Sequence, residues 1–300
     1  MTDSLAPGEE RDHRSDFDAR SSRGPLSLCV IIFTSNDEMH IERAIDSVDF
    51  ASQIIVVDSG STDRTCEIAK RLGADVYSED PSSRKPLLKW ALTKVSIATQ
   101  WTMYLEAEEA LPLELKEEIR SVLPTLPSSV SGVRLRRRLM FQGSEIRFGC
   151  LRRIGLLRLW RSGRASTESD WMDEQVLIGS DTSVTLNHGF YSDNLGDLTL
   201  YVRHQNNRST RKATDLISRD RDDAPTWRTL SRPWIENFAL RKLPFATGPL
   251  LHFLLRYVLL LGFLDGRAGF AYHFLQSFSY YAMVQVKYVE LIRDHVQSDL

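Results

Sequence analysis

The stretch that decides the fold is LSLCVIIFTSNDEMHIERAIDSVDFASQIIVVDSGSTD, residues Leu26 to Asp63. Two apolar runs rich in β-branched residues, Leu28 to Phe33 and Ile54 to Val57, each stop at a small polar cluster. The segment between them carries apolar residues at helical spacing: Ile41, Ala44, Ile45 and Val48. This pattern predicts a strand, a loop, a helix and a second strand, the unit that builds a parallel sheet covered on both faces.

Polar residues follow both apolar runs. Sheets of this kind bind ligands at the carboxyl ends of their strands, so we expect a ligand to be held by Thr34, Asn36, Asp37 and Asp58. A carboxylate that ends a buried strand is costly unless it meets a hydrogen-bonding partner. A nucleoside offers such partners in its ribose hydroxyls and base N–H groups.

These strand ends resemble those of family 2 glycosyltransferases of the GT-A fold, which carry T-x-N-E-E after one strand and V-D-x-G-S-x-D after the next. Here the motifs are Thr34-Ser35-Asn36-Asp37-Glu38 and Val57-Asp58-Ser59-Gly60-Ser61-Thr62-Asp63. The second match is close to complete, and the first departs at Asp37. The resemblance implies that these residues, including Ser59 and Asp63, bind a nucleotide-sugar donor. Asp63 fits equally well as the cap of the helix that follows.

Composition sets broad limits. The 300 residues are 42% hydrophobic, enough for one large domain or a domain with an appendage, and the formal net charge of -2 favours no polyanionic partner. Cys29, Cys66 and Cys150 form no C-x-x-C pair, which fits a reducing compartment. Residues 1–24 are polar and lack the apolar core of a signal peptide, so we predict a disordered cytosolic tail there.

We predict an α/β chain with a mostly parallel, Rossmann-like sheet flanked by helices and a helical, apolar C-terminal extension. The GT-A domain would span 25–210, with a nucleotide-sugar half (25–125) and an acceptor half (126–210), and the extension would span 211–300. A helix is expected from Arg84 to Thr99. Similar enzymes carry K-N-x-A-L in that helix, which implies a donor contact for Lys89, although Trp90 replaces the asparagine.

An acidic cluster follows the fourth expected strand, Trp101 to Leu105. Glu106-Ala107-Glu108-Glu109 stands where the family carries D-A-D-E. The resemblance implies a divalent cation, Mn²⁺ or Mg²⁺, bound by Glu106 and Glu108. Glutamate keeps the charge, but its extra methylene moves the carboxylate outward, which suits Mn²⁺ better than a rigid Mg²⁺ site. A shifted metal preference, a basic side chain in part of the metal's role, and lost activity all stay open.

The segment from Arg134 to Arg164 contains ten arginines and one acid, Glu145, and its glycines divide it into short expected strands. Its motifs F-x-G, R-x-G and R-L-W-R-S-G resemble a bacterial lipopolysaccharide-core subgroup of family 2. Arginine forks bind phosphate, so Arg158 could reach the donor diphosphate and its neighbours a phosphorylated acceptor. No recognised nucleic-acid module is present, and we expect no nucleic-acid partner.

Glycosyl transfer also needs a base for the acceptor hydroxyl. The resemblance points to Glu174, with Asp173 as the alternative, because Asp173-Glu174 stands where relatives show H-E or E-D. Direct displacement with the base opposite the leaving group predicts inversion at the anomeric carbon. Spacing alone would favour an exposed loop acid or a helix cap.

Two further motifs extend the resemblance to about Phe270. Asn207-Arg208-Ser209-Thr210 matches N-R-Y-S-T without the tyrosine, and 263–270 matches F-x-D-G-x-x-G-F. The apolar region 243–288 carries one helical stripe: Phe270, Phe274, Phe278, Tyr281, Val284 and Tyr288. This region could pack against the catalytic domain or lie in a bilayer surface as a peripheral membrane contact, and the two interpretations are weighed equally.

Taken together, the residues and the resemblance predict an inverting glycosyltransferase that uses a nucleotide-sugar donor. Its acceptor would be a saccharide or a lipid-linked saccharide of a bacterial cell-surface polysaccharide, reached at the inner face of the cytoplasmic membrane. The rival prediction is a degenerate, non-catalytic relative that binds nucleotide sugars or acts as a scaffold. The glutamates in the acidic cluster and Trp90 support the rival.

Overall fold

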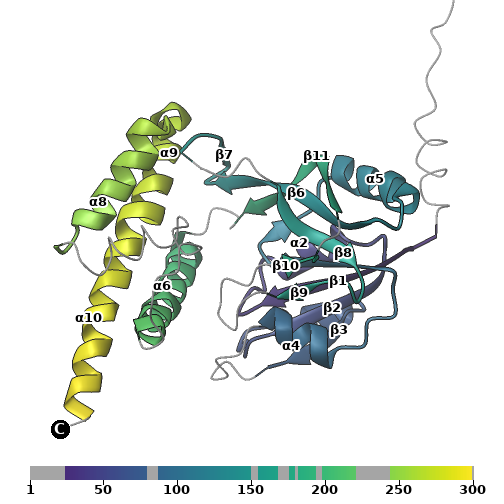
Figure 1. The fold of residues 1–300 in the computed structure, drawn as a ribbon, viewed down its shortest axis with the longest axis horizontal. Coiled ribbons are helices and arrows are strands. Elements are labelled where there is room, and N and C mark those ends of the chain that lie inside the picture. The colour runs from purple at the N-terminus through teal and green to yellow at the C-terminus, as the bar shows by residue number, and fades with distance from the viewer. Residues whose placement is uncertain are drawn as a thin grey trace, which may run out of the picture.

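A mixed β-sheet with helices on both faces forms one part of the molecule, and a layer of helices stands beside it (Figure 1). The computed structural model describes residues 24–79, 87–149, 155–167, 176–179, 182–193, 198–220 and 244–298. Within these residues the sheet has nine strands, eight of them in the order β3-β2-β1-β4-β8-β6-β11-β5. The predicted α/β class with a helical C-terminal extension is confirmed.

Four neighbouring strands of the N-terminal half run parallel: β1 (Leu26–Thr34), β2 (Ala51–Asp58), β3 (Asp75–Ser78) and β4 (Trp101–Glu106). The register pairs Thr34 with Asp58 and Phe33 with Glu106. The carboxyl ends of these strands therefore meet at one edge of the sheet, as the sequence predicts.

The remaining strands complete the sheet with mixed directions: β5 (Glu109–Ala110), β6 (Val130–Phe141), β7 (Ser144–Ile146), β8 (Leu156–Arg161) and β11 (Thr182–Asp193). β8 is antiparallel to both β4 and β6, and β11 is parallel to β6. β4, β6 and β11 consequently share one direction, which brings the end of β11 to the same edge as the end of β4. A separate pair joins β9 (Ser166–Thr167) and β10 (Val176–Leu177).

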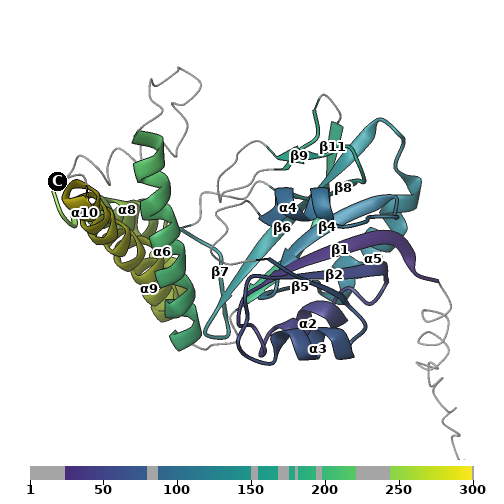
Figure 2. The same ribbon diagram turned by 90° about the horizontal axis from the view of Figure 1, so that it is seen from below.

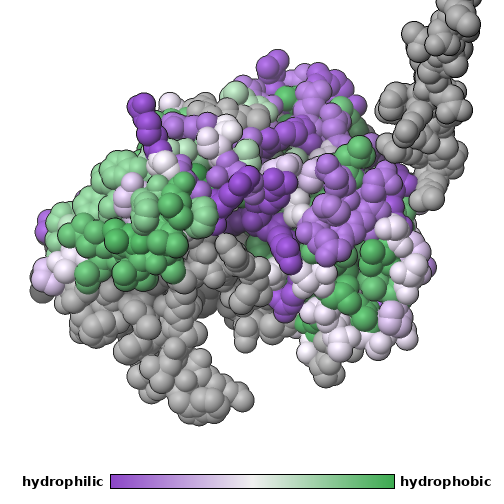
Figure 3. Space-filling view, turned by 90° about the horizontal axis from the view of Figure 1, so that it is seen from above, coloured by the Kyte–Doolittle hydropathy of each residue, from purple (hydrophilic) through white to green (hydrophobic). Residues whose placement is uncertain are grey.

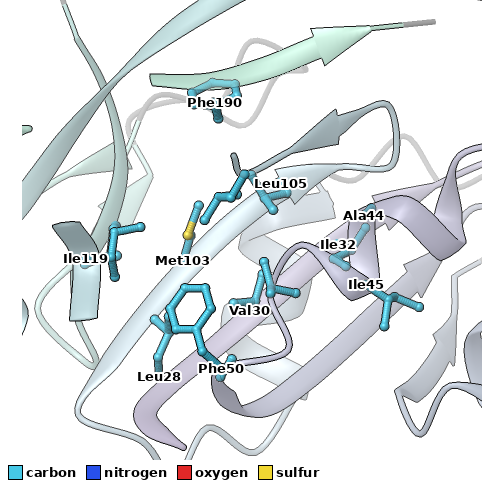
Figure 4. Close-up of a cluster of buried hydrophobic side chains, with 14 of the residues drawn as sticks. Leu28, Val30, Ile32, Ala44, Ile45, Phe50, Met103, Leu105, Ile119 and Phe190 are labelled. Carbon is cyan, nitrogen blue, oxygen red and sulfur yellow. The ribbon is translucent and has the colours of Figure 1, made fainter. Parts of the chain in front are cut away.

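The alternation of β1 sorts its side chains between two cores. Leu28, Val30 and Ile32 pack into one cluster (Figure 4), and the intervening Cys29, Ile31 and Phe33 pack into the other. The first cluster takes in α2 (Ile41–Asp46), α3 (Thr65–Arg71) and α5 (Leu113–Val122). The second takes in α4 (Leu87–Lys94) on the opposite face of the sheet (Figure 2). A short turn of helix, η1 (Leu123–Thr125), follows α5.

The C-terminal layer consists of helical segments: α6 (Leu198–Asp220), α8 (Thr247–Leu254), η3 (Leu255–Leu259), η4 (Gly262–Asp265), α9 (Gly266–His273), η5 (Phe274–Ser279) and α10 (Tyr280–Ser298). α6 packs on α10 through Ala213 and Leu216 against Val284 and Tyr288. The predicted domain boundary at 210 falls inside α6, which continues through it.

Asp265 and Arg256 join this layer to the sheet. The Asp265 carboxylate accepts the backbone N–H groups of Arg147 (3.1 Å) and Phe148 (2.9 Å), which follow the β6–β7 hairpin. Arg256 donates to the carbonyl of Gly149 at 2.8 Å. The R-x-G motif at 147–149 and the motif at 263–270 therefore meet in space. Their shared role in this fold is to dock the helices on the sheet.

The surface of the C-terminal layer is strongly apolar (Figure 3). Large apolar side chains are exposed along it, including Phe245, Leu251, Leu254, Val258, Leu259, Phe263 and Leu264. The predicted stripe is split between two roles. Phe270 and Phe274 are exposed, whereas Val284 and Tyr288 are buried against α6.

The described part of the chain contains no single helix with both the length and the apolar character of a membrane span. Thr247–Leu259 and Gly262–Arg293 meet those criteria only together, as a pair bent by 74°.

Candidate functional site

Two loops at the carboxyl edge are tied together by hydrogen bonds. Asn36 has a left-handed backbone (φ 58°), and its N–H donates to the Ser61 hydroxyl at 2.8 Å. Its side-chain oxygen accepts the Thr62 N–H at 2.8 Å. The Glu38 N–H donates to the Asp63 carboxylate at 3.2 Å. The two motifs that the sequence predicts to act together do form one structural unit.

Several predicted donor-binding residues shape these loops. Both oxygens of the buried Asp58 carboxylate accept the Ser61 N–H, and Oδ2 also accepts the Gly60 N–H. The Ser59 N–H donates to the Thr34 carbonyl at 3.0 Å. Asp63, two residues before α3 begins, accepts the N–H of Thr65, the first residue of the helix, at 3.0 Å, and so pairs one of the donors that a helix start leaves open.

Asp37 differs from these residues because only one of its two carboxylate oxygens accepts hydrogen bonds within the described residues. Oδ2 accepts the Thr34 hydroxyl (3.0 Å) and the Ser35 N–H (2.9 Å). Oδ1 is buried and has no hydrogen-bond partner among the described residues, and His204 Nε2 lies 3.8 Å away. Burial raises the pKa of the Asp37 carboxyl. An oxygen in this condition is a candidate contact for a ligand donor group.

The three glutamates after β4 lie in different environments. Glu109 is buried and paired with Arg158 (2.7 Å), and its other oxygen accepts the Glu106 N–H at 3.0 Å. Burial, and then the charges of Glu108 and Glu109, raises the pKa of Glu106 to about 8. Burial acts to raise the pKa of Glu108 too, but Arg208 and nearby polar groups bring it below its ordinary value. The contact with Arg208 therefore favours the charged form of Glu108.

Arg158 is held inside the sheet. Its guanidinium lies over the rings of Tyr104 (4.1 Å) and Phe190 (5.0 Å) and pairs with Glu109. Other arginines of the same band also have structural contacts: Arg161 donates to the carbonyls of Val130 and Leu126. Arg158 thus neutralises the acidic cluster through Glu109. Its contact with a donor diphosphate stays a prediction.

α6 supplies a basic face that the sequence analysis did not assign. His204, Arg208 and Arg211 recur at spacings of four and three, which places them on one side of the helix. Arg208 Nη2 donates to Glu108 Oε1 at 3.1 Å. The N-R-S-T motif contained the signal for this contact, but nothing local in the sequence showed that it faces an acid one hundred positions earlier.

The described residues do not fit the divalent cation that the resemblance implies. No group of three or more His, Cys, Asp or Glu side chains in the described ranges is placed to hold a metal ion. Glu108 is committed to Arg208, and Glu109 to Arg158. Glu106 and Glu108 lie at the predicted sheet edge, yet as an ion-paired cluster and not as an open pair of ligands.

The remaining predicted residues lie elsewhere. Lys89 is exposed on α4, the helix that covers the other face of the sheet. Asp173 and Glu174, the predicted base and its alternative, lie outside the described residues, as does Cys150. A further polar residue, His188 of β11, is paired with Glu118 of α5 through Nδ1 at 2.9 Å and through its backbone N–H at 2.9 Å, which fits a structural role.

Comparison with known proteins points to glycosyltransferases. A protein of Rickettsia bellii named as an uncharacterized glycosyltransferase is 39% identical over 100 residues, 32% of this chain and 32% of that protein. A similarly named protein of Rickettsia typhi is 36% identical over the same shares. The chain therefore spans about a third of the length of the curated relatives it matches. No family model matches the sequence.

Solved structures add little. The crystal structure of glucosyl-3-phosphoglycerate synthase from Mycobacterium tuberculosis with Mn²⁺, UDP and glucosyl-3-phosphoglycerate is 22% identical, covering 46% of this chain and 51% of that chain. Its TM-score is 0.29. Because that score is low, the likeness supports no conclusion about this chain.

Proposed function

We propose that this protein is a glycosyltransferase that transfers a sugar from a nucleotide-sugar donor. The observation that carries the proposal is the single carboxyl edge at which the Thr34–Asp37 loop, the Asp58–Asp63 loop and the glutamate cluster lie together. The edge is where a ligand binds in sheets of this type. The similarity to proteins named glycosyltransferases over 100 residues supports the same class.

The transfer step would be a direct displacement. The bond between the anomeric carbon and the phosphate oxygen breaks, and its electron pair leaves with the nucleoside diphosphate. A bond forms between the acceptor oxygen and the same carbon from the opposite side, and the acceptor proton passes to a carboxylate. Inversion follows from this geometry. We retain Glu174 as the proposed base, with Asp173 as the alternative.

In this proposal Asp37 Oδ1 accepts a hydrogen bond from the donor's nucleoside. Asn36, Asp58, Ser59 and Asp63 hold the loops that form the binding surface, as their hydrogen bonds indicate. The proposal assigns no step to a divalent cation, because the carboxylates of the described residues do not form a metal site.

The acceptor and the location are proposed from the sequence and the apolar surface. We propose a saccharide or lipid-linked acceptor of a bacterial cell-surface polysaccharide, reached at the cytoplasmic side of the membrane. The support is the resemblance to the lipopolysaccharide-core subgroup and the exposed apolar side chains of 245–292. A lipid surface suits these residues because isolated proteins rarely expose so large an apolar area without a partner.

A second candidate, a nucleotide-sugar-binding protein without transferase activity, is favoured by one observation. Both Glu108 and Glu109 are neutralised by arginines, so the acidic cluster differs from the family's metal-binding pattern. Such a protein would bind the donor without turning it over.

One experiment with two readouts separates the candidates. A screen of UDP-, GDP- and ADP-sugars, with and without Mn²⁺, should show one nucleotide class that raises the melting temperature. With that donor, Glu174→Gln should lower turnover by roughly a hundredfold, with donor binding kept, because the base is lost. Glu108→Gln should also lower turnover strongly. Asp173→Asn is the comparison for the base.

The outcomes are distinct. If no sugar nucleotide stabilises the protein, the donor-binding proposal fails. Stabilisation without any turnover by the wild-type protein identifies the binding protein. Turnover that survives unchanged in Glu174→Gln and Asp173→Asn removes the assignment of the base.

A further inference from the structure

The basic face of α6 closes over the acidic edge of the sheet. Arg208 pairs with Glu108 at 3.1 Å, and one turn earlier His204 lies 3.8 Å from Asp37 Oδ1. The next basic residue on this face, Arg211, interacts electrostatically with Glu106. A positively charged helix face thus lies where the chains of β1 and β4 end.

Arg208 keeps capacity for a second anion. A guanidinium has five N–H donors, and within the described residues only Nη2 of Arg208 has a hydrogen-bond partner. Its side chain is 53% exposed, whereas that of Glu108 is 12% exposed. The guanidinium therefore reaches from a buried carboxylate to the surface. This is the arrangement that lets arginine bind a phosphate group in bidentate fashion.

Contacts from α10 and η5 hold α6 in this position. Lys287 Nζ of α10 donates to the Asn206 carbonyl and side-chain oxygens (2.7 Å each), the Ser209 hydroxyl (2.9 Å) and the Thr210 hydroxyl (2.7 Å). These acceptors flank Arg208 along the helix. Gln205 donates to Gln276 of η5. The N-R-S-T motif therefore contacts α10 through Ser209 and Thr210, and its Arg208 side chain points to Glu108 at the sheet edge.

We infer that Arg208 binds the diphosphate of the nucleotide and supplies, without a divalent cation, the positive charge that stabilises it as it leaves. The inference rests on the proposed function and adds a residue to it. It follows from two features together. Glu108 and Glu109 of the cluster are paired with arginines, and the cluster forms no metal site within the described ranges. A half-exposed guanidinium, that of Arg208, lies at its rim. Diphosphate carries the developing charge in transfer, and a fixed cation there stabilises the transition state.

The test is calorimetry of UDP, GDP and ADP binding to the full chain in EDTA. The wild-type protein should bind one of them, and Arg208→Gln should weaken that binding by about tenfold or more, because a charge-assisted pair is lost. Arg203→Gln, which removes a charge from another exposed position of α6, is the matched control and should bind as the wild type does.

A second variant, Arg208→Lys, distinguishes weaker binding from a folding defect, because it keeps a positive charge beside Glu108. It should fold as the wild-type protein does and bind about threefold or more weakly, since the fork geometry is lost. Equal binding by wild type and Arg208→Gln, or binding that requires Mn²⁺, overturns the inference but leaves donor binding intact. Absence of nucleotide binding with and without Mn²⁺ overturns the proposed function itself, and the inference with it.

Discussion

The Asp58 carboxylate accepts hydrogen bonds from the N–H groups of Gly60 and Ser61, two and three residues later in the chain. The side chains of Asn36 and Asp63 each accept a backbone N–H of the other loop. Each of these side chains lets the backbone turn sharply at a strand end without leaving polar groups unpaired. The motif residues therefore shape the site, and they leave the buried Oδ1 atom of Asp37 without a hydrogen-bond partner among the described residues.

Asp63 tests whether a motif residue shapes the loop or touches the ligand. Asp63→Ala should lower the free energy of unfolding by about 1 to 2 kcal/mol, because the hydrogen bonds from the N–H groups of Glu38 and Thr65 are both lost. Asp63→Asn should keep most of that stability, since the asparagine side-chain oxygen can accept the same N–H groups. Urea unfolding measures both values. A stable Asp63→Ala variant with lost nucleotide binding would instead identify a ligand contact.

At the scale of elements, α6 and the β6–β7 hairpin connect the two parts of the molecule. α6 touches the acidic edge through Arg208 and packs on α10 through Leu216. The hairpin is followed by Gly149, whose N–H donates to the Leu260 carbonyl at 2.9 Å. Each connection includes one residue of a sequence motif, Arg208 in the first and Gly149 in the second.

Gly149 tests the second connection. Its φ is +70°, and a Cβ there would lie 2.3 Å from the His273 ring and 2.8 Å from the Arg256 carbonyl oxygen. Gly149→Ala should therefore undock the C-terminal layer and lower the melting temperature markedly. Gly143→Ala is the matched control, because Gly143 has a similar φ of +73° but open space around its Cβ position. Differential scanning calorimetry compares them, and equal losses would show that only backbone strain matters.

For the whole molecule, α6 lies between the sheet and the other C-terminal helices, which carry the exposed apolar side chains (Figure 2). The exposed side chains of 245–292 would meet a lipid surface while α6 keeps its basic face on the sheet. An open groove of about 440 Å³ runs along the continuous helical segment of η5 and α10, and Phe274, Phe278 and Val286 line it together with Lys287 and Glu290. An acceptor carried in a membrane would then approach the site beside α6.

Sedimentation with vesicles of phosphatidylethanolamine and phosphatidylglycerol tests this orientation. The wild-type chain should bind, and Leu251→Ser combined with Leu259→Ser should reduce binding by about tenfold or more, because two exposed leucines lose their burial in lipid. Leu113→Ser, on the exposed side of α5, is the control and should bind normally. Failure of the wild-type chain to bind, or equal binding by the double variant, would contradict the proposed membrane contact.

The predictable part of the fold follows from local rules. β-branched runs mark β1 and β2, and helical spacing marks α2. α4 begins at Leu87 within the described residues and ends at Lys94, short of the predicted Thr99. The predicted strand-end residues Thr34, Asp58 and Glu106 lie at one edge, because parallel strands align their carboxyl ends.

The sequence by itself determined the parallel strands, the polar loops at their ends and the apolar character of the C-terminal helices. Each depends on residues close together in the chain, whose spacing dictates how they hydrogen-bond and which side they bury. Only the tertiary structure decided that Arg158 neutralises Glu109, that Arg208 meets Glu108, and that Asp265 receives the residues before Gly149. Those pairs join distant positions, and the packing of one layer on another, not any local pattern, sets which charges come within reach.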